Sequence, residues 1–289
     1  ALSETVRASL GARLDAYSTF GTSINPRAAL IWHPYTDGNS KVIAGKAFRA
    51  PSIYELYYND GGTTQIASPD LHPESIYSLE LEHSHRFSRT VTGVLALFSN
   101  YVTDLVELRE APSDPTLIQY QNSPTPLVTT GAELGIRRDW RQGWMLGASY
   151  GFTHAQFLAS GGASDLFVLK SNPAKRHAAN APQHSASVKG AVPLLARALT
   201  AATRLTLEDV RYDRFEDEDP TAEPQRRTDA AVVWDIVLSG EEKRFGLSYA
   251  FGVYNAFDWR YSLPVSPEFR QRTIEQDGRT FLASLGLAL

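Results

Sequence analysis

The sequence predicts an all-β fold, an antiparallel transmembrane β-barrel of which about twelve strands are present. Three observations lead to this fold class. Apolar residues alternate with polar or small residues along most of the chain, which is the period of a strand with two different faces. The connections between these stretches alternate between short and long. No uncharged apolar run approaches the roughly 18 residues that a membrane-spanning helix needs.

The composition excludes several classes of function and of site. The chain has 289 residues and a formal net charge of -4, with Lys and Arg scattered among about as many acidic residues. A nucleic-acid partner usually requires a basic face, so we expect no nucleic acid. The absence of cysteine excludes a disulfide framework and thiolate metal sites.

The strand period defines two faces. It is clearest at residues 77–82, 144–153, 199–208, 232–238 and 245–253. Between residues 199 and 208 the odd positions are apolar or small, whereas charge is confined to even positions such as Arg204 and Glu208. We therefore expect Leu205 to face lipid and Thr206 to face the lumen.

The connections predict which end of the sheet carries the loops. Short turns are expected at residues 35–40, 86–89, 140–143, 194–197 and 240–243, and long polar loops at residues 50–73, 157–181, 213–225 and 258–277. Outer-membrane barrels place short turns in the periplasm and long loops outside. A soluble all-β domain, whose half-buried strands also alternate, is the alternative, but it has no reason to separate loop lengths in this way.

Several motifs resemble those of one family. They read FRAPS at residues 48–52, SPDLHPE at 68–74, NAPQH at 180–184, NAFDWRY at 255–261 and GRTF at 278–281. The chain resembles TonB-dependent outer-membrane receptors of the siderophore and vitamin B12 type over nearly its whole length. The family usually ends on an aromatic residue, and Leu289 departs from that pattern.

The resemblance implies a domain organisation. Residues 1–289 would be the C-terminal portion of a receptor β-barrel domain of about 22 strands, with the plug domain and the N-terminal strands absent. Because the chain enters directly on a strand, we expect Ala1 not to be the natural N-terminus. The partners implied are outer-membrane lipid, the missing plug and strands, the TonB complex through the missing N-terminal part, and an iron-siderophore or corrinoid substrate.

The function implied is a receptor and transporter in the bacterial outer membrane, for TonB-energised uptake of a scarce bulky nutrient such as a ferric siderophore or cobalamin. The alternatives are a smaller closed barrel that acts as a passive channel or envelope enzyme, and a soluble β-rich binding module. His-x-Ser, Gly-x-Ser-x-Gly and Gly-rich phosphate loops are absent from the sequence, so we expect neither an enzyme nor a cofactor.

The candidate substrate-binding residues are Arg49, Tyr54, Tyr57 and Tyr58 in the first long loop and at its start. Pro51 cannot donate to a strand ladder, so the strand should end near Arg49. Arg49 either contacts a plug or substrate in the lumen, or pairs with an interior carboxylate such as Glu80 or Glu82. The tyrosines either stack on a flat catecholate, corrin ring or sugar, or form an interfacial aromatic girdle.

Two groups of residues raise the question of a metal. The acidic residues Asp213, Glu216, Asp217, Glu218 and Asp219 could bind Ca²⁺, but they lack the spacing of a calcium loop and are expected to form a solvated loop. Metal ligation by His154, His177 and His184 is conceivable, whereas His83 and His85 should lie on the outer face near a turn. We expect no metal site.

Overall fold

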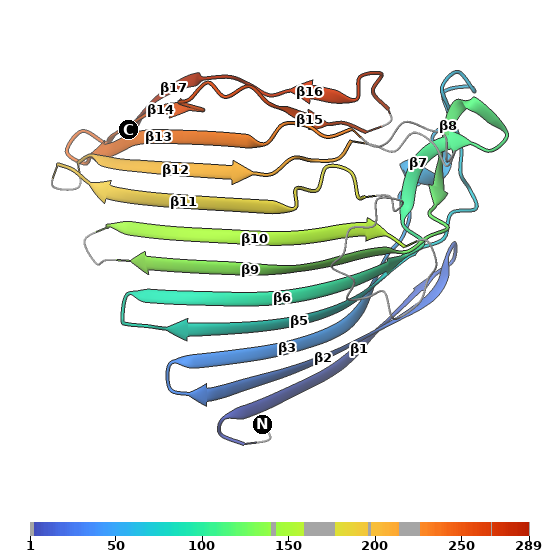
Figure 1. Ribbon diagram of the computed structural model, residues 1–289, viewed down its shortest axis with the longest axis horizontal. Coiled ribbons are helices and arrows are strands. Elements are labelled where there is room, and N and C mark those ends of the chain that lie inside the picture. The colour runs from blue at the N-terminus through green and yellow to red at the C-terminus, as the bar shows by residue number, and fades with distance from the viewer. Residues whose placement is uncertain are drawn as a thin grey trace.

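Twelve strands form one antiparallel sheet whose order follows the chain (Figure 1). The computed structural model describes residues 3–139, 143–158, 177–195, 198–213, 226–266 and 268–288. The sheet contains β1 (Val6–Tyr17), β2 (Gly21–Tyr35), β3 (Gly38–Arg49), β5 (Glu74–Arg86), β6 (Val91–Thr103), β9 (Leu127–Asp139), β10 (Met145–Phe157), β11 (His184–Pro193), β12 (Thr200–Glu208), β13 (Ala231–Glu242), β14 (Leu247–Tyr254) and β17 (Thr280–Leu287). The predicted all-β class and strand number are therefore confirmed. No helix in the described ranges is long and apolar enough to cross a membrane.

The remaining elements lie in the connections at one end of the sheet, which we name the loop end; the opposite end is the turn end (Figure 1). They are α1 (Ile53–Tyr57), β4 (Gln65–Ile66), β7 (Val106–Ala111), β8 (Asp114–Asn122), β15 (Ser262–Pro264) and β16 (Thr273–Glu275). The β7–β8 hairpin was not predicted as part of a loop, because Val106 and Leu108 alternate with Glu107 and Arg109 as sheet residues do.

Most of the described connections agree in length with the prediction. β2 and β3 are joined by residues 36–37 at the turn end, and the long loops 50–73 and 258–277 lie at the loop end (Figure 1). The predicted turns 86–89 and 240–243 fall where residues 87–90 join β5 to β6 and residues 243–246 join β13 to β14. Residues 140–142, 159–176, 196–197 and 214–225, which make up most of the remaining predicted turns and loops, are outside the described residues. One connection differs, because the turn of residues 18–20 is short yet lies at the loop end.

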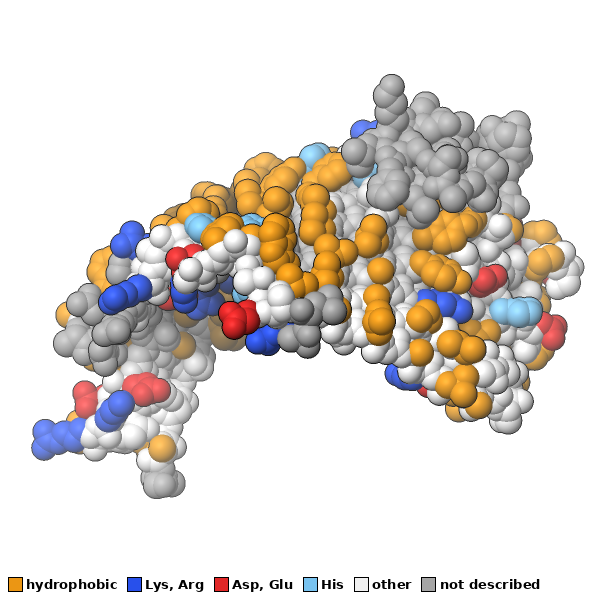
Figure 2. Space-filling view, turned by 90° about the horizontal axis from the view of Figure 1, so that it is seen from below, with side chains coloured by type: hydrophobic (Ala, Val, Ile, Leu, Met, Phe, Trp, Pro, Cys, Tyr) orange, Lys and Arg blue, Asp and Glu red, His pale blue; other side chains and the backbone are white. Residues whose placement is uncertain are grey.

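One face of the sheet carries rows of exposed apolar side chains. Register places Leu30 beside Val42, Val42 beside Leu81 and Leu81 beside Leu97. These four side chains are between 40% and 44% exposed, although a soluble sheet would cover such a row. In Figure 2 hydrophobic side chains form rows over the middle of the visible face, and charged ones lie mainly toward its ends. This is the pattern of a lipid-facing surface.

The other face carries ion pairs that span neighbouring strands. Lys41 pairs with Glu82 at 2.7 Å, and Arg204 on β12 pairs with Asp235 on β13 at 2.9 Å. On the opposite face of the same two strands, the Trp234 ring nitrogen donates to the Thr203 hydroxyl, and Leu205 lies opposite Trp234. The predicted separation of Leu205 from the charged positions of β12 is thus present.

The sheet has two free edges among the described residues, since β1 pairs with β2 and β17 pairs with β14. The structure therefore does not show the closed twelve-strand barrel that the alternative channel or enzyme would require.

The predicted outer-face histidines lie near a turn. At the turn end, His83 forms a hydrogen bond with the Tyr35 hydroxyl, and His85 packs edge-on against Phe87. These histidines lie at the expected end of the sheet.

Candidate functional site

A short capped helix presents the candidate tyrosines. β3 ends at Arg49, two residues before Pro51, and Ser52 begins α1 as its N-cap. The Ser52 hydroxyl accepts from the Glu55 N–H, and the Glu55 carboxylate accepts from the Ser52 N–H at 2.6 Å. This reciprocal capping box, together with the burial of Leu56, holds a helix that would be too short to form by itself.

Arg49 joins the strand that leaves the sheet to the strand that re-enters it. Its guanidinium pairs with Glu55 at 2.9 Å and with Glu74, the first residue of β5, at 2.6 Å. Arg49 is therefore in an ion pair, but the suggested partners Glu80 and Glu82 were wrong. The register of β3 on β5 puts Glu74 opposite Arg49 and Glu82 opposite Lys41, and sequence spacing could not reveal this register.

The electrostatics of Glu55 follow from these contacts. Burial raises the pKa of the Glu55 carboxyl, but hydrogen bonds from the Ser52 backbone N–H and from Arg49 outweigh the burial and lower that pKa below its usual value. The carboxylate is thus charged at neutral pH and holds both the helix N-terminus and Arg49.

The three tyrosines expose their rings at the loop end. Tyr54 and Tyr58, one helical turn apart, are stacked with ring centroids 4.5 Å apart, and Tyr54 meets Tyr120 of β8 edge-on at 6.2 Å. Tyr54, Tyr57 and Tyr58 are 47%, 56% and 41% exposed. Tyr54 and Tyr57 lie on α1 and Tyr58 is its C-cap, so all three belong to a loop and not to a strand of the sheet. Their rings offer flat apolar surface to solvent.

Two further residues belong to this cluster. The Tyr120 hydroxyl donates to the Glu268 carboxylate at 3.2 Å. Burial and the negative charge of Glu268 raise the pKa of Tyr120 to about 12, so the phenol remains a hydrogen-bond donor at physiological pH. Neither residue was among the predicted binding residues, because the two lie far apart in the chain.

The loop behind the helix is fixed mainly by polar bonds. The Asp60 carboxylate accepts from the backbone N–H groups of Thr63, Thr64 and Gln65. The Thr64 hydroxyl and these amides lower the pKa of Asp60. Farther along, the Ser68 N–H donates to the Leu56 carbonyl at 2.8 Å, and β4 pairs with β8. The loop that carries the tyrosines is therefore connected by hydrogen bonds to the β7–β8 hairpin.

The residues considered for metal binding have other partners. Asp213 is 1% exposed and accepts from the Arg226 N–H and from Arg272 at 2.7 Å. The expectation of a solvated loop was therefore wrong for Asp213, because an arginine distant in sequence covers its charge. Glu216, Asp217, Glu218 and Asp219 lie outside the described residues.

The candidate histidines do not form a metal cluster in the described part of the chain, where no group of three or more His, Cys, Asp and Glu residues is placed to hold an ion. His184 bonds the Tyr150 hydroxyl at 2.7 Å. The rings of His154 and His177 are 6.1 Å apart, and His177 stacks on Tyr212 at 4.2 Å. Burial and the neighbouring His154 lower the pKa of His177.

These features first define a class of protein. A twelve-stranded antiparallel sheet with an exposed apolar face, a polar opposite face and long loops at one end is the wall of a bacterial outer-membrane β-barrel. The family model "TonB dependent receptor-like, beta-barrel" matches residues 1–256, and the chain belongs to this family. Its members are transport receptors of the outer membrane, not enzymes.

Relatives and solved structures agree with this assignment. The iron-regulated outer membrane virulence protein of Vibrio cholerae serotype O1 is 27% identical over 169 residues, which are 54% of this chain and 26% of that protein. The siderophore receptor PirA from Acinetobacter baumannii has a TM-score of 0.74 at 16% identity, over 98% of this chain and 43% of that chain. A ferric enterobactin receptor mutant from Pseudomonas aeruginosa, in complex with enterobactin, has a TM-score of 0.72 at 16% identity, over 99% and 43%. The chain thus spans about a quarter of the curated relative and less than half of these solved chains.

Proposed function

We propose that this chain supplies part of the barrel wall and the ligand-capture loops of an outer-membrane receptor for a ferric siderophore. Transport would be energised through TonB. The observation that carries the proposal is the cluster of exposed tyrosine rings on α1. Tyr54, Tyr57 and Tyr58 present flat aromatic surface from a helix that Arg49 and Glu55 hold in place. Such surfaces suit the planar aryl groups of a catecholate chelator.

The names of the relatives support iron over other nutrients. The Vibrio cholerae protein is described as iron-regulated, and the similar structures include siderophore and ferric enterobactin receptors. Cobalamin is the second candidate, because a corrin ring is also a bulky planar ligand that aromatic side chains can contact.

We further propose that additional strands and a plug complete the barrel. The free edges of β1 and β17 carry backbone groups that lipid cannot satisfy, so both edges require partner strands in a membrane. The polar face also contains a hollow of about 510 Å³, where a plug domain could bind. Small residues such as Gly135, Ser149 and Ser187 line it, and Glu82, Glu133 and Glu208 border it. Glu82 and Glu208 already pair with Lys41 and Arg211, so Glu133 is the carboxylate of this hollow that would favour a basic side chain on the plug.

The test of ligand capture is a double substitution, Tyr54→Ala with Tyr58→Ala, in the full-length receptor. We expect binding of a ferric catecholate siderophore to weaken by roughly tenfold or more, because stacking of a ligand ring on an aromatic side chain contributes about 1 kcal/mol per contact. Equilibrium binding on outer-membrane fractions, with labelled ferric siderophore, measures the change.

The control is Tyr35→Ala, which removes an equally exposed tyrosine at the turn end. It should leave the affinity unchanged. Competition with excess cobalamin separates the two nutrient classes. Loss of siderophore binding in the presence of cobalamin would favour the corrinoid, and wild-type affinity in the double variant would remove the tyrosines from the capture site.

A further inference from the structure

The sheet splits where β2 and β3 approach the loop end. The β2–β3 ladder ends at the pair Arg27 and Gly45, although the β1–β2 ladder continues to Tyr17 and Gly21. Pro26, the next residue on β2, has no N–H to donate to a ladder. β3 itself remains paired with β5 up to Arg49. A gap therefore separates residues 21–26 from residues 46–49.

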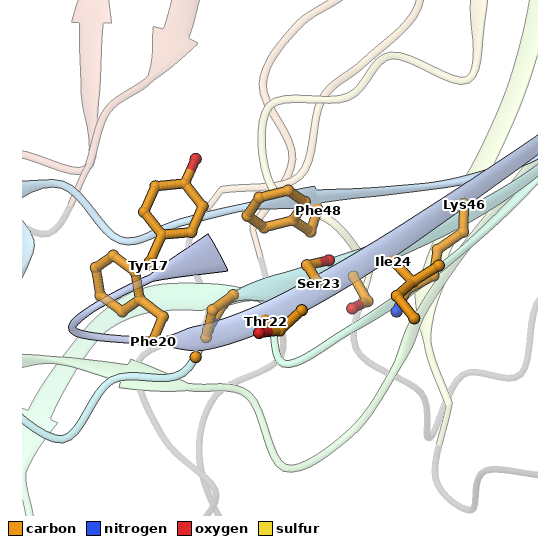
Figure 3. Close-up of a pocket in the computed structure, with 10 residues that line it drawn as sticks. Tyr17, Phe20, Thr22, Ser23, Ile24, Lys46 and Phe48 are labelled. Atoms are coloured by element: carbon orange, nitrogen blue, oxygen red, sulfur yellow. The ribbon is translucent and has the colours of Figure 1, made fainter. Parts of the chain in front are cut away.

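A hollow of about 400 Å³ occupies this gap (Figure 3). It is lined by Tyr17, Phe20, Gly21, Thr22, Ser23, Ile24, Lys46, Phe48, Pro73 and Ser75. Figure 3 shows Tyr17 and Phe20 at one end and Lys46 at the other, with Thr22 and Ser23 between them. The Tyr17 ring lies 5.8 Å from Phe20 and 5.9 Å from Phe48, so the aromatic end is one cluster.

The β3 side of the hollow belongs to the apolar face of the sheet. Lys46 lies opposite Tyr77, which shares its face with the exposed Leu79 and Leu81. The Lys46 ammonium is 5.8 Å from the centre of the Tyr77 ring, and among the described residues no carboxylate pairs with it. Lys41 of the same strand faces the other way and pairs with Glu82. Lys46 is thus a cation at the loop-end margin of a lipid-facing surface.

The gap also requires a polar occupant. In an antiparallel strand, alternate residues direct their N–H and C=O groups toward each neighbour, so residues 21–26 direct some of these groups into the gap. Backbone groups that face hydrocarbon without partners are strongly unfavourable, so an acyl chain cannot fill the hollow alone. The Ser23 hydroxyl already donates to the Asn25 side chain. A group with hydroxyls and a negative charge satisfies the backbone, Thr22 and Lys46 together.

We propose that this hollow binds the phosphorylated sugar head group of an outer-leaflet glycolipid. Lys46 pairs with the phosphate, the aromatic cluster packs on the apolar side of the sugar, and the exposed Ile24 contacts the start of the acyl chains. This assignment depends on the loop end facing outward, as in the proposed receptor, but not on which nutrient the receptor carries.

The experiment compares two lipids on the full-length receptor in detergent. Native mass spectrometry measures binding of a bis-phosphorylated glucosamine disaccharide lipid and of the same lipid without phosphates. We expect the phosphorylated lipid to bind more tightly, and Lys46→Gln to weaken it by roughly fivefold, the effect of one lysine at an anionic membrane surface. Lys46→Arg should retain binding, and Lys41→Gln is the matched control, since it removes a lysine of the same strand from the opposite face.

Three outcomes would overturn the proposal. Equal binding of both lipids would show that phosphate is not recognised, and unchanged binding in Lys46→Gln would show that the lysine merely extends toward the interface. Displacement of the lipid by millimolar inorganic phosphate would indicate a site for a soluble anion. Siderophore binding, measured on the same variants, should stay at the wild-type level, so a failure of the lipid site is distinguishable from a failure of the receptor function.

Discussion

The sheet and the loop end differ in how far their apolar side chains are buried. Large apolar side chains of the sheet, such as Leu81 and Leu97, are more than 40% exposed, whereas Leu56 and Leu71 in the loop 50–73 are at most 8% exposed. Buried polar side chains such as Gln65 and Ser68 also lie in this loop. Among the described residues, the buried apolar side chains therefore gather at the loop end, in the loops and at the ends of β9, β10 and β13.

The sheet and the loop end differ in burial because lipid surrounds the sheet and water surrounds the loop end. In the sheet, lipid covers the apolar face and the ladders satisfy the backbone, so no internal core is needed. The loop end meets water, and its irregular backbone must be satisfied by side chains. Asp60, Asn122 and Ser52 do this through hydrogen bonds to N–H or C=O groups of neighbouring segments.

The largest effect is expected on the lipid face of β12. Leu205→Arg would place a cation in hydrocarbon and should lower the free energy of unfolding by roughly 2–4 kcal/mol if the site lies near the bilayer midplane. Thr206→Arg would enter the polar face beside Arg204 and Glu208 and should cost little. Denaturant titration of the receptor folded into lipid vesicles measures both. Equal losses would contradict the assigned faces, and a larger loss at Thr206 would mean that they are exchanged.

The second effect concerns the ion pairs of Arg49. Arg49→Leu would leave Glu55 and Glu74, whose side chains are 14% and 12% exposed, without their cation. We expect the local stability of residues 50–73 to fall by about 2 kcal/mol, because part-buried charged groups lose their hydrogen bonds. Hydrogen exchange of this loop measures the change. Arg49→Lys should restore part of it, since an ammonium keeps the charge but not the fork that bridges two carboxylates.

A smaller effect is expected at the helix cap. Ser52→Ala removes the acceptor for the Glu55 N–H and should cost about 1 kcal/mol of local stability. Exchange of the α1 amides should accelerate accordingly, while the strand amides of β3 and β5 keep their protection. Ser187→Ala, on the polar face of β11, is the control. Unchanged exchange in Ser52→Ala would show that Leu56 and Arg49 alone hold the helix.

The smallest effect is a pH dependence at Asp60. Hydrogen bonds from Thr64 and backbone amides lower the pKa of this carboxyl in the folded loop. Its contribution is therefore present above the pKa of Asp in the unfolded chain and is lost as pH falls through the lower folded pKa. Exchange protection of residues 63–65 should persist at neutral and mildly acidic pH and decline only in strong acid. In Asp60→Asn the protection should be reduced at neutral pH and should no longer depend on this titration.

The fold was largely predictable from periodicity, and the site only in part. Alternation revealed the faces of β12 because charge at Arg204 and apolar character at Leu205 are local properties of the chain. The position of Arg49 and the tyrosines near a strand exit followed from Pro51 and its neighbours. The helix α1 was not anticipated, since five residues carry too little periodicity, and its capping box acts only where burial of Leu56 supports it.

The sequence by itself determined the all-β class, the two faces of the strands and the uneven lengths of the connections, because each depends on residues close together in the chain. The tertiary structure alone decided that Arg49 pairs with Glu74 instead of Glu82, that Tyr120 and Glu268 join the tyrosine cluster, and that Arg272 buries Asp213. It also decided that the ladder beyond Arg27 opens into a hollow. These contacts depend on strand register and on segments far apart in sequence, and alternation specifies which face a residue occupies but not which residue lies opposite it.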